Sequence, residues 1–216
     1  MKLLFIESKK KFFQSVPNLD FLPEKIGLLY SVQYKPLFEK IKVELEKNKK
    51  KVFVGKSSLN EGQILGCNIQ SALSIESKVD CFLLVSSGKF HALSLMLNAK
   101  KPLYILGDKI ERIGEKEIES LKKKRKAALS KFLLANRIGI IASTKQGQQN
   151  MIEAIKLKKQ LKAEHKEAFV FISDNINTAE FENFKIDFWV NTACPGIIFD
   201  VPNMINISEL KTIIKV

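Results

Sequence analysis

Cysteine, proline, glycine and long apolar runs are all scarce in this chain of 216 residues. No apolar run approaches the ~18 residues of a membrane-spanning helix. Near the start only residues 3–6 are continuously apolar, which is shorter than the ~7–15 residues of a secretory signal. Ten glycines and six prolines exclude a collagen-like or low-complexity chain. Three cysteines make a disulfide scaffold implausible. We therefore expect a globular cytoplasmic protein with no membrane contact.

Arginine is also rare, although Lys plus Arg outnumber Asp plus Glu by 36 to 23. A net charge of +13 is typical of nucleic-acid-binding proteins. The basic residues are nearly all lysine, however, and no aromatic residues are interleaved with the lysine runs at 9–11, 49–51 and 122–126. Such runs usually form solvated faces. We expect no direct nucleic-acid recognition and only a general attraction to acidic partners.

Short apolar runs alternate with amphipathic segments along the chain. The runs show no polar alternation, which is typical of strands buried on both faces of a parallel sheet. Strands are expected at 2–6, 26–30, 51–54, 81–85, 103–106, 137–142, 168–172, 188–192 and 197–200. Helices are expected at 35–46, 91–97, 115–134, 147–161, 179–183 and 208–214, the last with Ser208 as N-cap. Repeated βαβ units predict an α/β fold of two Rossmann-like parallel-sheet units, without an obvious internal repeat.

A long charged segment at 111–134 separates the two units. We expect a first α/β domain at 24–110, a bridging helix at 111–134 and a second α/β domain at 135–216. Residues 1–23 form either an N-terminal remnant or a strand that contacts a partner. An exposed apolar patch there predicts association with a companion chain or a homo-oligomer.

The candidate ligand-binding segments follow the predicted strands, because ligands of such folds bind at the carboxyl ends of parallel strands. They are residues 61–68, 86–91, 143–149 and 191–196. Two of them carry a cysteine, Cys67 and Cys194, whereas Cys81 opens an apolar strand. A free cysteine is most often a small buried residue, and that interpretation stays open for both. Pro195 ends the strand directly after Cys194, which holds the thiol where it can meet a metal.

Two further segments have weaker signals. His91 either packs at the start of a helix or directs a polar group into the crevice. Residues 144–148 can offer backbone N–H groups to a carboxylate or phosphate. Their single glycine does not make a P-loop. The sequence also contains no HExxH, GxSxG or paired-glycine dinucleotide motif.

Five segments together resemble the diphthamide synthesis family, the 3-amino-3-carboxypropyltransferases of archaea and eukaryotes. They are Ser-Val-Gln-Tyr at 31–34, Gly-Gln-Ile-Leu-Gly-Cys-Asn at 62–68, Gly-Lys-Phe-His at 88–91, Thr-Lys-Gln-Gly-Gln at 144–148 and Asp-Phe-Trp-Val-Asn-Thr-Ala-Cys-Pro at 187–195. Leu-Gly-Cys-Asn followed by Asn-Thr-Ala-Cys-Pro is the specific pair. The resemblance runs from about residue 25 to the C-terminus and covers only the second and third of the family's three domains.

This resemblance implies an unconventional radical S-adenosylmethionine enzyme. In the family, one cysteine from each domain holds a 4Fe–4S cluster that also binds S-adenosylmethionine, consistent with the preference of such clusters for thiolates. The 3-amino-3-carboxypropyl group is transferred as a radical to a histidine of translation elongation factor 2. For this chain the resemblance implies Cys67 and Cys194 as metal ligands and leaves the catalytic residues unknown. It also implies a set of cofactor-binding residues, Gln33, Gly88, His91, Lys145, Gln146 and Gly147.

The chain departs from the family pattern in three places. The first domain and its cysteine are absent, and Cys81, at the start of a strand, does not replace it. Gly196 stands where the family usually has arginine, and Ser86-Ser87 replaces Gly-Asp before Gly88. The resemblance therefore implies a 2-(3-amino-3-carboxypropyl)histidine synthase that is active only with a companion chain. The alternatives are a degenerate non-catalytic subunit that supports an active homologue and a generic Rossmann-like small-molecule binder.

Overall fold

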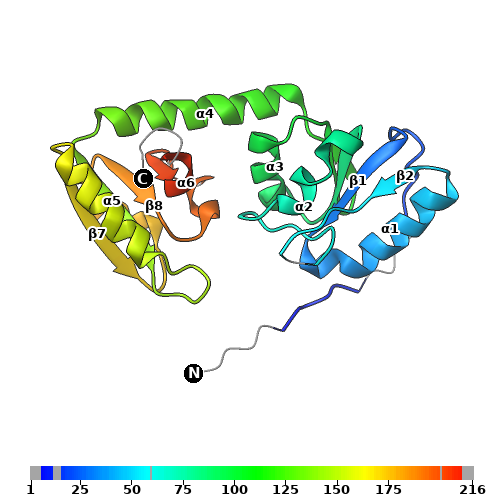
Figure 1. Ribbon diagram of the computed structural model, residues 1–216, viewed down its shortest axis with the longest axis horizontal. Coiled ribbons are helices and arrows are strands. Elements are labelled where there is room, and N and C mark those ends of the chain that lie inside the picture. The colour runs from blue at the N-terminus through cyan, green and yellow to red at the C-terminus, as the bar shows by residue number, and fades with distance from the viewer. Residues whose placement is uncertain (1–5, 12–15, 59, 200, 211–216) are drawn as a thin grey trace. The chain divides into compact units, whose positions relative to one another are not determined.

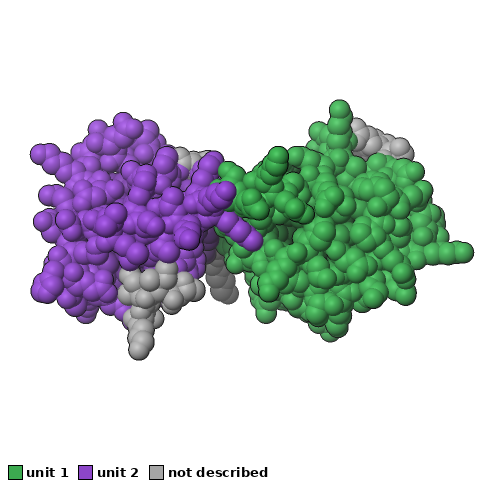
Figure 2. All heavy atoms as spheres, turned by 90° about the horizontal axis from the view of Figure 1, so that it is seen from above, with its two compact units in different colours: residues 1–121 green, residues 122–216 purple. Residues whose placement is uncertain are grey.

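The computed structural model describes residues 6–11, 16–58, 60–199 and 201–210. It divides into two compact units, residues 1–121 and 122–216, which Figure 2 colours separately. Helix α4 (Glu115–Leu134) begins in the first unit and ends in the second. The domain limits expected from the sequence, and the role given there to residues 1–23, stay predictions.

Unit 1 is built on a five-stranded sheet in the order β2-β1-β3-β4-β5 (Figure 1). Its strands are β1 (Lys25–Tyr30), β2 (Lys51–Phe53), β3 (Cys81–Val85), β4 (Leu103–Leu106) and β5 (Ile110–Arg112). The first four are parallel and β5 pairs antiparallel with β4. The helical segments are η1 (Val32–Tyr34), α1 (Lys35–Lys47), α2 (Gln70–Leu73), η2 (Glu76–Lys78), η3 (Phe90–Ala92) and α3 (Leu93–Asn98).

The two faces of this sheet are covered by different helices. Ile41 and Leu45 of α1 pack with Leu28 of β1 on one face. Met96 of α3 packs with Phe82 of β3 on the other. Right-handed crossovers require this arrangement, because the chain moves from β1 out to β2 and then crosses back over β1 to β3. The reversal creates a topological switch point between β1 and β3, where ligands of open α/β sheets bind.

Unit 2 repeats this plan with four parallel strands in the order β7-β6-β8-β9. Its strands are β6 (Arg137–Ser143), β7 (Glu167–Ser173), β8 (Phe188–Asn191) and β9 (Met204–Asn206). Its further helical segments are α5 (Met151–Ala163), η4 (Thr178–Asn183), η5 (Pro195–Phe199) and α6 (Ile207–Leu210). Side chains of α4, α5 and α6 cover one face, and the segments containing η4 and η5 cover the other. The switch point here lies between β6 and β8.

A partly buried ion pair connects helix α6 to helix α4. Arg125 bonds Glu209 of α6 at 2.9 Å and donates a second hydrogen bond, 3.0 Å long, to the carbonyl oxygen of Met204. The guanidinium thus joins α4, β9 and α6 within unit 2. A paired and hydrogen-bonded arginine is the form in which a charge tolerates burial.

The two units share a short internal sequence repeat, which was not predicted. Residues 25–31 read Lys-Ile-Gly-Leu-Leu-Tyr-Ser, and residues 137–143 read Arg-Ile-Gly-Ile-Ile-Ala-Ser. In each unit the glycine lies beside an aromatic residue of the neighbouring strand, Gly27 beside Phe82 and Gly139 beside Trp189. A Cβ atom on Gly27 would lie 2.6 Å from the Phe82 ring, and one on Gly139 would lie 2.4 Å from the Trp189 ring. The glycines therefore leave the space in which the aromatic rings pack.

Most expected elements are confirmed with small shifts at their ends, and the fold class is confirmed as two mostly parallel α/β sheets. The expected strand at 197–200 is wrong, because η5 (Pro195–Phe199) occupies that segment and β9 is the last strand. Helix α6 begins at Ile207, so Ser208 lies inside it and is not its N-cap. Of the expected strand at 2–6 only Ile6 lies within the described residues, and 211–214 of the last helix lie outside them. Within the described part of the chain, no helix is long and apolar enough to cross a membrane.

Candidate functional site

Cys67 lies at the tip of a tight turn formed by residues 65–68. The segment leading to it runs beside the end of β1, where the Ile64 amide donates to the Tyr30 carbonyl at 2.9 Å. Leu65 and Asn68 then exchange two backbone hydrogen bonds of 2.9 and 3.1 Å. Gly66 and Cys67 are thus the central residues of a two-residue turn, and Cys67 is exposed. The turn places its thiol at the switch-point edge of unit 1.

The predicted cofactor-binding segment 88–91 adjoins this turn. The Ser94 hydroxyl, at the start of α3, donates to the carbonyl oxygen of Gly66. A Cβ atom on Gly66 would lie 3.3 Å from the Phe90 ring, so a larger residue would require the ring to shift by a few tenths of an ångström. Gly88 has a φ of +64°, which favours glycine and turns the chain from β3 into η3. The structure therefore brings Cys67, Gly88 and His91 to one edge of unit 1.

His91 is a half-buried histidine of η3. Its Nδ1 atom is buried without a hydrogen-bond partner among the described residues. Burial lowers the pKa of His91, because the charged imidazolium is poorly solvated there. The neutral ring can accept or donate a hydrogen bond but contributes no fixed positive charge.

We expect this histidine to make unit 1 less stable in acid. The folded-state pKa of His91 lies below the unfolded value of about 6.5. The contribution of His91 to the free energy of unfolding of unit 1 is therefore fully present above pH ~6.5. It is lost as the pH falls from there toward the lower folded pKa, because the unfolded chain binds the proton first. Urea unfolding followed by tyrosine emission, at wavelengths shorter than the tryptophan emission of Trp189, reports mainly on unit 1, since all three tyrosines lie in it.

The matched variants are His91→Asn and His165→Asn. His165 is exposed and has a φ of +60°, a conformation that asparagine accepts. The His91→Asn variant should lose less unit 1 stability than the parent protein between pH 7.5 and 5.5. The His165→Asn variant should lose as much as the parent protein. An unchanged slope in His91→Asn would show that other groups cause the acid sensitivity.

Cys194 lies three residues beyond the end of β8, which ends at Asn191, at the switch-point edge of unit 2. Thr192 anchors the strand end, because its amide and its hydroxyl both donate to the Ile141 carbonyl of β6, at 3.0 and 2.8 Å. Cys194 is half-buried and Pro195 starts η5 immediately after it. As the sequence predicts, the thiol stands at a strand terminus. That it shares a crevice with Cys67 stays a prediction.

Cys81 differs from both. It opens β3, is fully buried, and burial raises the pKa of its thiol to about 12, with Asp80 adding to the shift. A metal-binding cysteine must ionise, and this one resists ionisation. Each unit therefore offers one accessible thiol, and the third cysteine is inert. Accessible thiolates are the ligands that iron–sulfur clusters take, so the donor chemistry fits such a cluster.

The remaining predicted site residues lie on exposed loops. Lys145, Gln146 and Gly147 follow β6, and Gly147 has a φ of +79°. Helix α5 begins only at Met151, so these residues do not form its N-terminus, contrary to the expectation of a helix from 147. Gln33 is exposed in η1 after β1, and its carbonyl accepts the Lys10 amide at 2.9 Å.

Two hollows of unit 2 were not predicted from the sequence. A polar one of about 250 Å³ lies at the ends of β8 and β9 beside the Cys194 segment. It is lined by Asn150, Glu153, Asn191, Thr192, Ala193, Pro195, Asn206, Ile207 and Ser208. The usable sequence signal is an asparagine at the end of each strand, Asn191 and Asn206.

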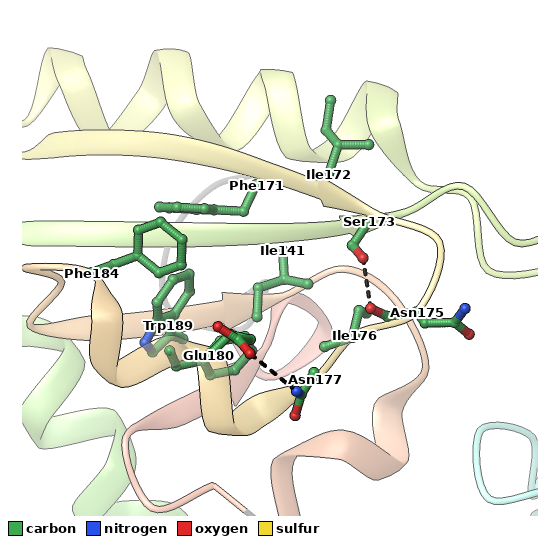
Figure 3. Close-up of a pocket in the computed structure, with 11 residues that line it drawn as sticks. Ile141, Phe171, Ile172, Ser173, Asn175, Ile176, Asn177, Glu180, Phe184 and Trp189 are labelled. Carbon is green, nitrogen blue, oxygen red and sulfur yellow. Dashed lines mark hydrogen bonds between the residues drawn. The ribbon is translucent and has the colours of Figure 1, made fainter.

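The second hollow is an apolar pocket of about 220 Å³ between the sheet and η4. Figure 3 shows the rings of Phe171, Phe184 and Trp189 at one end and Ser173 and Asn175 at the other. The stacked pair Phe181 and Trp189, with centroids 4.3 Å apart, fills much of this face. None of the cysteines or predicted cofactor-binding residues lines this pocket, so it is separate from the candidate site.

The described residues contain no cluster of three or more His, Cys, Asp or Glu side chains able to hold a metal ion. A cluster with three protein thiolates therefore requires more than the two accessible cysteines of this chain. That one ligand comes from elsewhere stays a prediction.

Comparisons with known proteins give a consistent result. A family model described as "Putative diphthamide synthesis protein" matches residues 3–206. The 2-(3-amino-3-carboxypropyl)histidine synthase of Pyrococcus horikoshii is 27% identical over 190 residues, covering 87% of this chain and 55% of that protein. The enzyme of the same name from Methanocaldococcus jannaschii is 27% identical over 182 residues, covering 82% and 46%. A relative from Gibberella zeae, 26% identical over 183 residues and covering 81% and 39%, is named subunit 1 of this synthase.

A solved structure is similar across both units. The crystal structure of Dph2 from Pyrococcus horikoshii with a 4Fe–4S cluster has a TM-score of 0.77 and 27% identity, covering 88% of this chain and 57% of that one. The chain thus spans about half the length of the relatives that it matches.

Proposed function

Because the chain belongs to the diphthamide synthesis family, we propose that it is part of a 2-(3-amino-3-carboxypropyl)histidine synthase. One observation carries this proposal. Each unit holds one accessible thiol at its switch-point edge, whereas the third thiol is buried with a raised pKa. This is the distribution that a cluster held by one cysteine per domain requires. The 4Fe–4S cluster of the similar Dph2 structure supports the same cofactor.

In the proposed enzyme, Cys67 and Cys194 are two ligands of a 4Fe–4S cluster. When bound, the cluster supplies the electron that cleaves S-adenosylmethionine at its aminocarboxypropyl carbon. The cofactor-binding roles that the family resemblance implies fall on exposed or half-buried residues of segments that follow the strands. In unit 1 they are Gln33, Gly88 and His91, and in unit 2 they are Lys145, Gln146 and Gly147. The exposed Lys145 ammonium suits a carboxylate, whereas neutral His91 suits an uncharged partner.

The proposed protein substrate is translation elongation factor 2, modified in the cytoplasm by transfer of the 3-amino-3-carboxypropyl group to a histidine. The third cluster ligand comes from a companion chain, or from a second copy in a homo-oligomer.

The test is anaerobic reconstitution with iron and sulfide, performed on this chain alone and on this chain co-purified with its partner from the same cell. Each sample then receives S-adenosylmethionine, a low-potential reductant and elongation factor 2. If a companion supplies the third ligand, we expect iron, sulfide and the mass increase of elongation factor 2 only when the companion is present. The same three signals from this chain alone would show that a second copy supplies that ligand. The mass increase should map to a single histidine.

Two differences from the family's usual sequence pattern support an alternative function. Gly196 and Ser86-Ser87 lack the charged groups that the family usually carries near its cofactor. A companion complex that holds iron without using Cys67 or Cys194 would favour a degenerate, non-catalytic subunit. Absence of iron from every complex would contradict the proposed enzyme altogether.

A further inference from the structure

Two buried asparagines lie opposite each other at the ends of β8 and β9. Asn191 and Asn206 are register partners in the parallel pair, with exposed fractions of 1% and 8%. The Asn191 Nδ2 atom donates to Asn206 Oδ1 at 2.7 Å. We call these two residues the amide pair. A buried amide is costly unless its hydrogen bonds are satisfied, so such a pair is expected to have fixed partners.

The remaining bonds of the amide pair all end on the backbone around Cys194. Asn191 Nδ2 also donates to the Cys194 carbonyl at 2.8 Å, and Asn191 Oδ1 accepts the Ala193 amide at 2.9 Å. Asn206 Nδ2 donates to the Pro195 carbonyl at 3.2 Å. Backbone groups at three consecutive residues, 193 to 195, are therefore held by two side chains.

Asn206 is itself fixed from the other side. Its backbone amide donates to Glu209 Oε1 at 3.0 Å, and the same carboxylate is bonded by Arg125 of α4. The amide pair thus connects the Cys194 backbone to the partly buried ion pair that joins α4 and α6. A network in which every member is satisfied in a low-dielectric interior is rigid.

We infer that Asn191 and Asn206 are positioning residues for Cys194. They fix the backbone on both sides of the thiol, so that its direction is set before any partner or metal arrives. The consequence for a cluster rests on the proposed function, in which Cys194 is a ligand. The effect on the thiol itself does not, because it concerns only bonds within unit 2.

The first test measures the thiol without iron. In a Cys67→Ser background, Cys194 is the only accessible cysteine, since Cys81 is fully buried. The rate of alkylation by iodoacetamide at fixed pH is followed by intact mass. We expect Asn206→Ala to raise this rate about tenfold, the change in local opening that one net hydrogen bond supports. Asn206→Asp has the same size but loses the donor to Pro195. Because its carboxylate also disfavours the reactive thiolate, the rates are compared at a pH at which the thiol is fully ionised, and there Asn206→Asp should also raise the rate.

The matched control is Asn203→Ala. Asn203 is exposed, lies just before β9 and accepts a hydrogen bond from the Lys131 ammonium, 2.9 Å long, away from the Cys194 backbone. In the Asn203→Ala variant, the alkylation rate of Cys194 should equal that in the Cys67→Ser parent. Trp189, the single tryptophan and a residue of β8, reports whether unit 2 stays folded. A positioning role predicts faster alkylation at urea concentrations where the Trp189 signal of each Asn206 variant is still native.

Unchanged alkylation in both Asn206 variants would overturn the inference. So would acceleration in Asn206→Ala alone, since that pattern indicates lost packing volume rather than a lost donor. In the companion complex, the absorption spectrum and reduction potential of the cluster should shift in Asn206→Asp relative to Asn203→Ala. A parent complex without iron would refute the proposed enzyme and leave the alkylation result standing.

Discussion

Replacing Cys67 or Cys194 by alanine is expected to remove the iron from the reconstituted complex, a loss of more than about tenfold, because a structural metal site fails when a ligand is deleted. A cluster that keeps one iron open for S-adenosylmethionine has three protein ligands, and the loss of any one leaves a second iron without a protein ligand. Transfer of the aminocarboxypropyl group should disappear together with the iron. Iron and sulfide are quantified after gel filtration under anaerobic conditions.

Cys81→Ala is the internal control for this experiment. Its thiol is buried at the start of β3 and resists ionisation, so the substitution should leave iron binding nearly intact. It should lower the stability of unit 1 by only about 1 kcal/mol, as is typical of a small core truncation. If Cys81→Ala also strips the iron, the proposed ligand set is wrong. If iron stays in all three variants, the cluster belongs entirely to the companion.

Gly55→Ala is expected to destabilise unit 1 by about 3 kcal/mol, at the upper end of the usual cost of overpacking. A Cβ atom on Gly55 would lie 1.8 Å from the backbone carbonyl oxygen of Ser71 in α2. Backbone cannot yield as a flexible side chain does, so α2 or the strand end must move. Gly55 also accepts hydrogen bonds from the Ser71 hydroxyl at 2.7 Å and from the Gly62 amide at 2.9 Å. Both bonds shape the segment that leads to Cys67.

Gly114→Ala gives the comparison for this substitution. A Cβ atom on Gly114 meets no atom within 4 Å, and α4 begins at the next residue. The Gly114→Ala substitution should change the stability of unit 1 by less than about 1 kcal/mol, the range of an N-terminal cap effect. Urea unfolding by tyrosine fluorescence compares both variants in unit 1. Equal midpoints for the two would show that the contact with Ser71 relaxes without cost.

The fold was predictable because the central strands of both sheets are buried on both faces. Strands such as β3 and β6 consist almost entirely of apolar residues, and their composition alone marks them. The short strands β5 and β9 have three residues each and lack that signal. Helix α5 starts later than expected because residues 144–150 form a turn, in which the Gln148 amide donates to the Lys145 carbonyl at 3.0 Å. Periodicity does not reveal such a local bond.

The candidate site was predictable where the chain itself carries the chemistry. Cys194 could be placed from the proline that follows β8, and Cys81 could be set aside from its place at the start of an apolar run. The turn that presents Cys67 depends on Phe90 and Ser94, which are distant in sequence and meet Gly66 only after folding. The sequence shows Asn206 only as an asparagine near a strand end, and its pairing with Asn191 of another strand forms only on folding.

Strand β7 has a consequence for handling the purified protein. In the described part of the chain it is an edge strand, paired only with β6, and it exposes Phe169 and Ile172. Open apolar edges recruit strands from other molecules, which leads to aggregation. The Arg137 guanidinium lies 5.6 Å from the centre of the Phe169 ring and covers part of this edge with charge. Salt screens the repulsion between molecules of this chain, whose net charge is +13, so precipitation should begin at high salt.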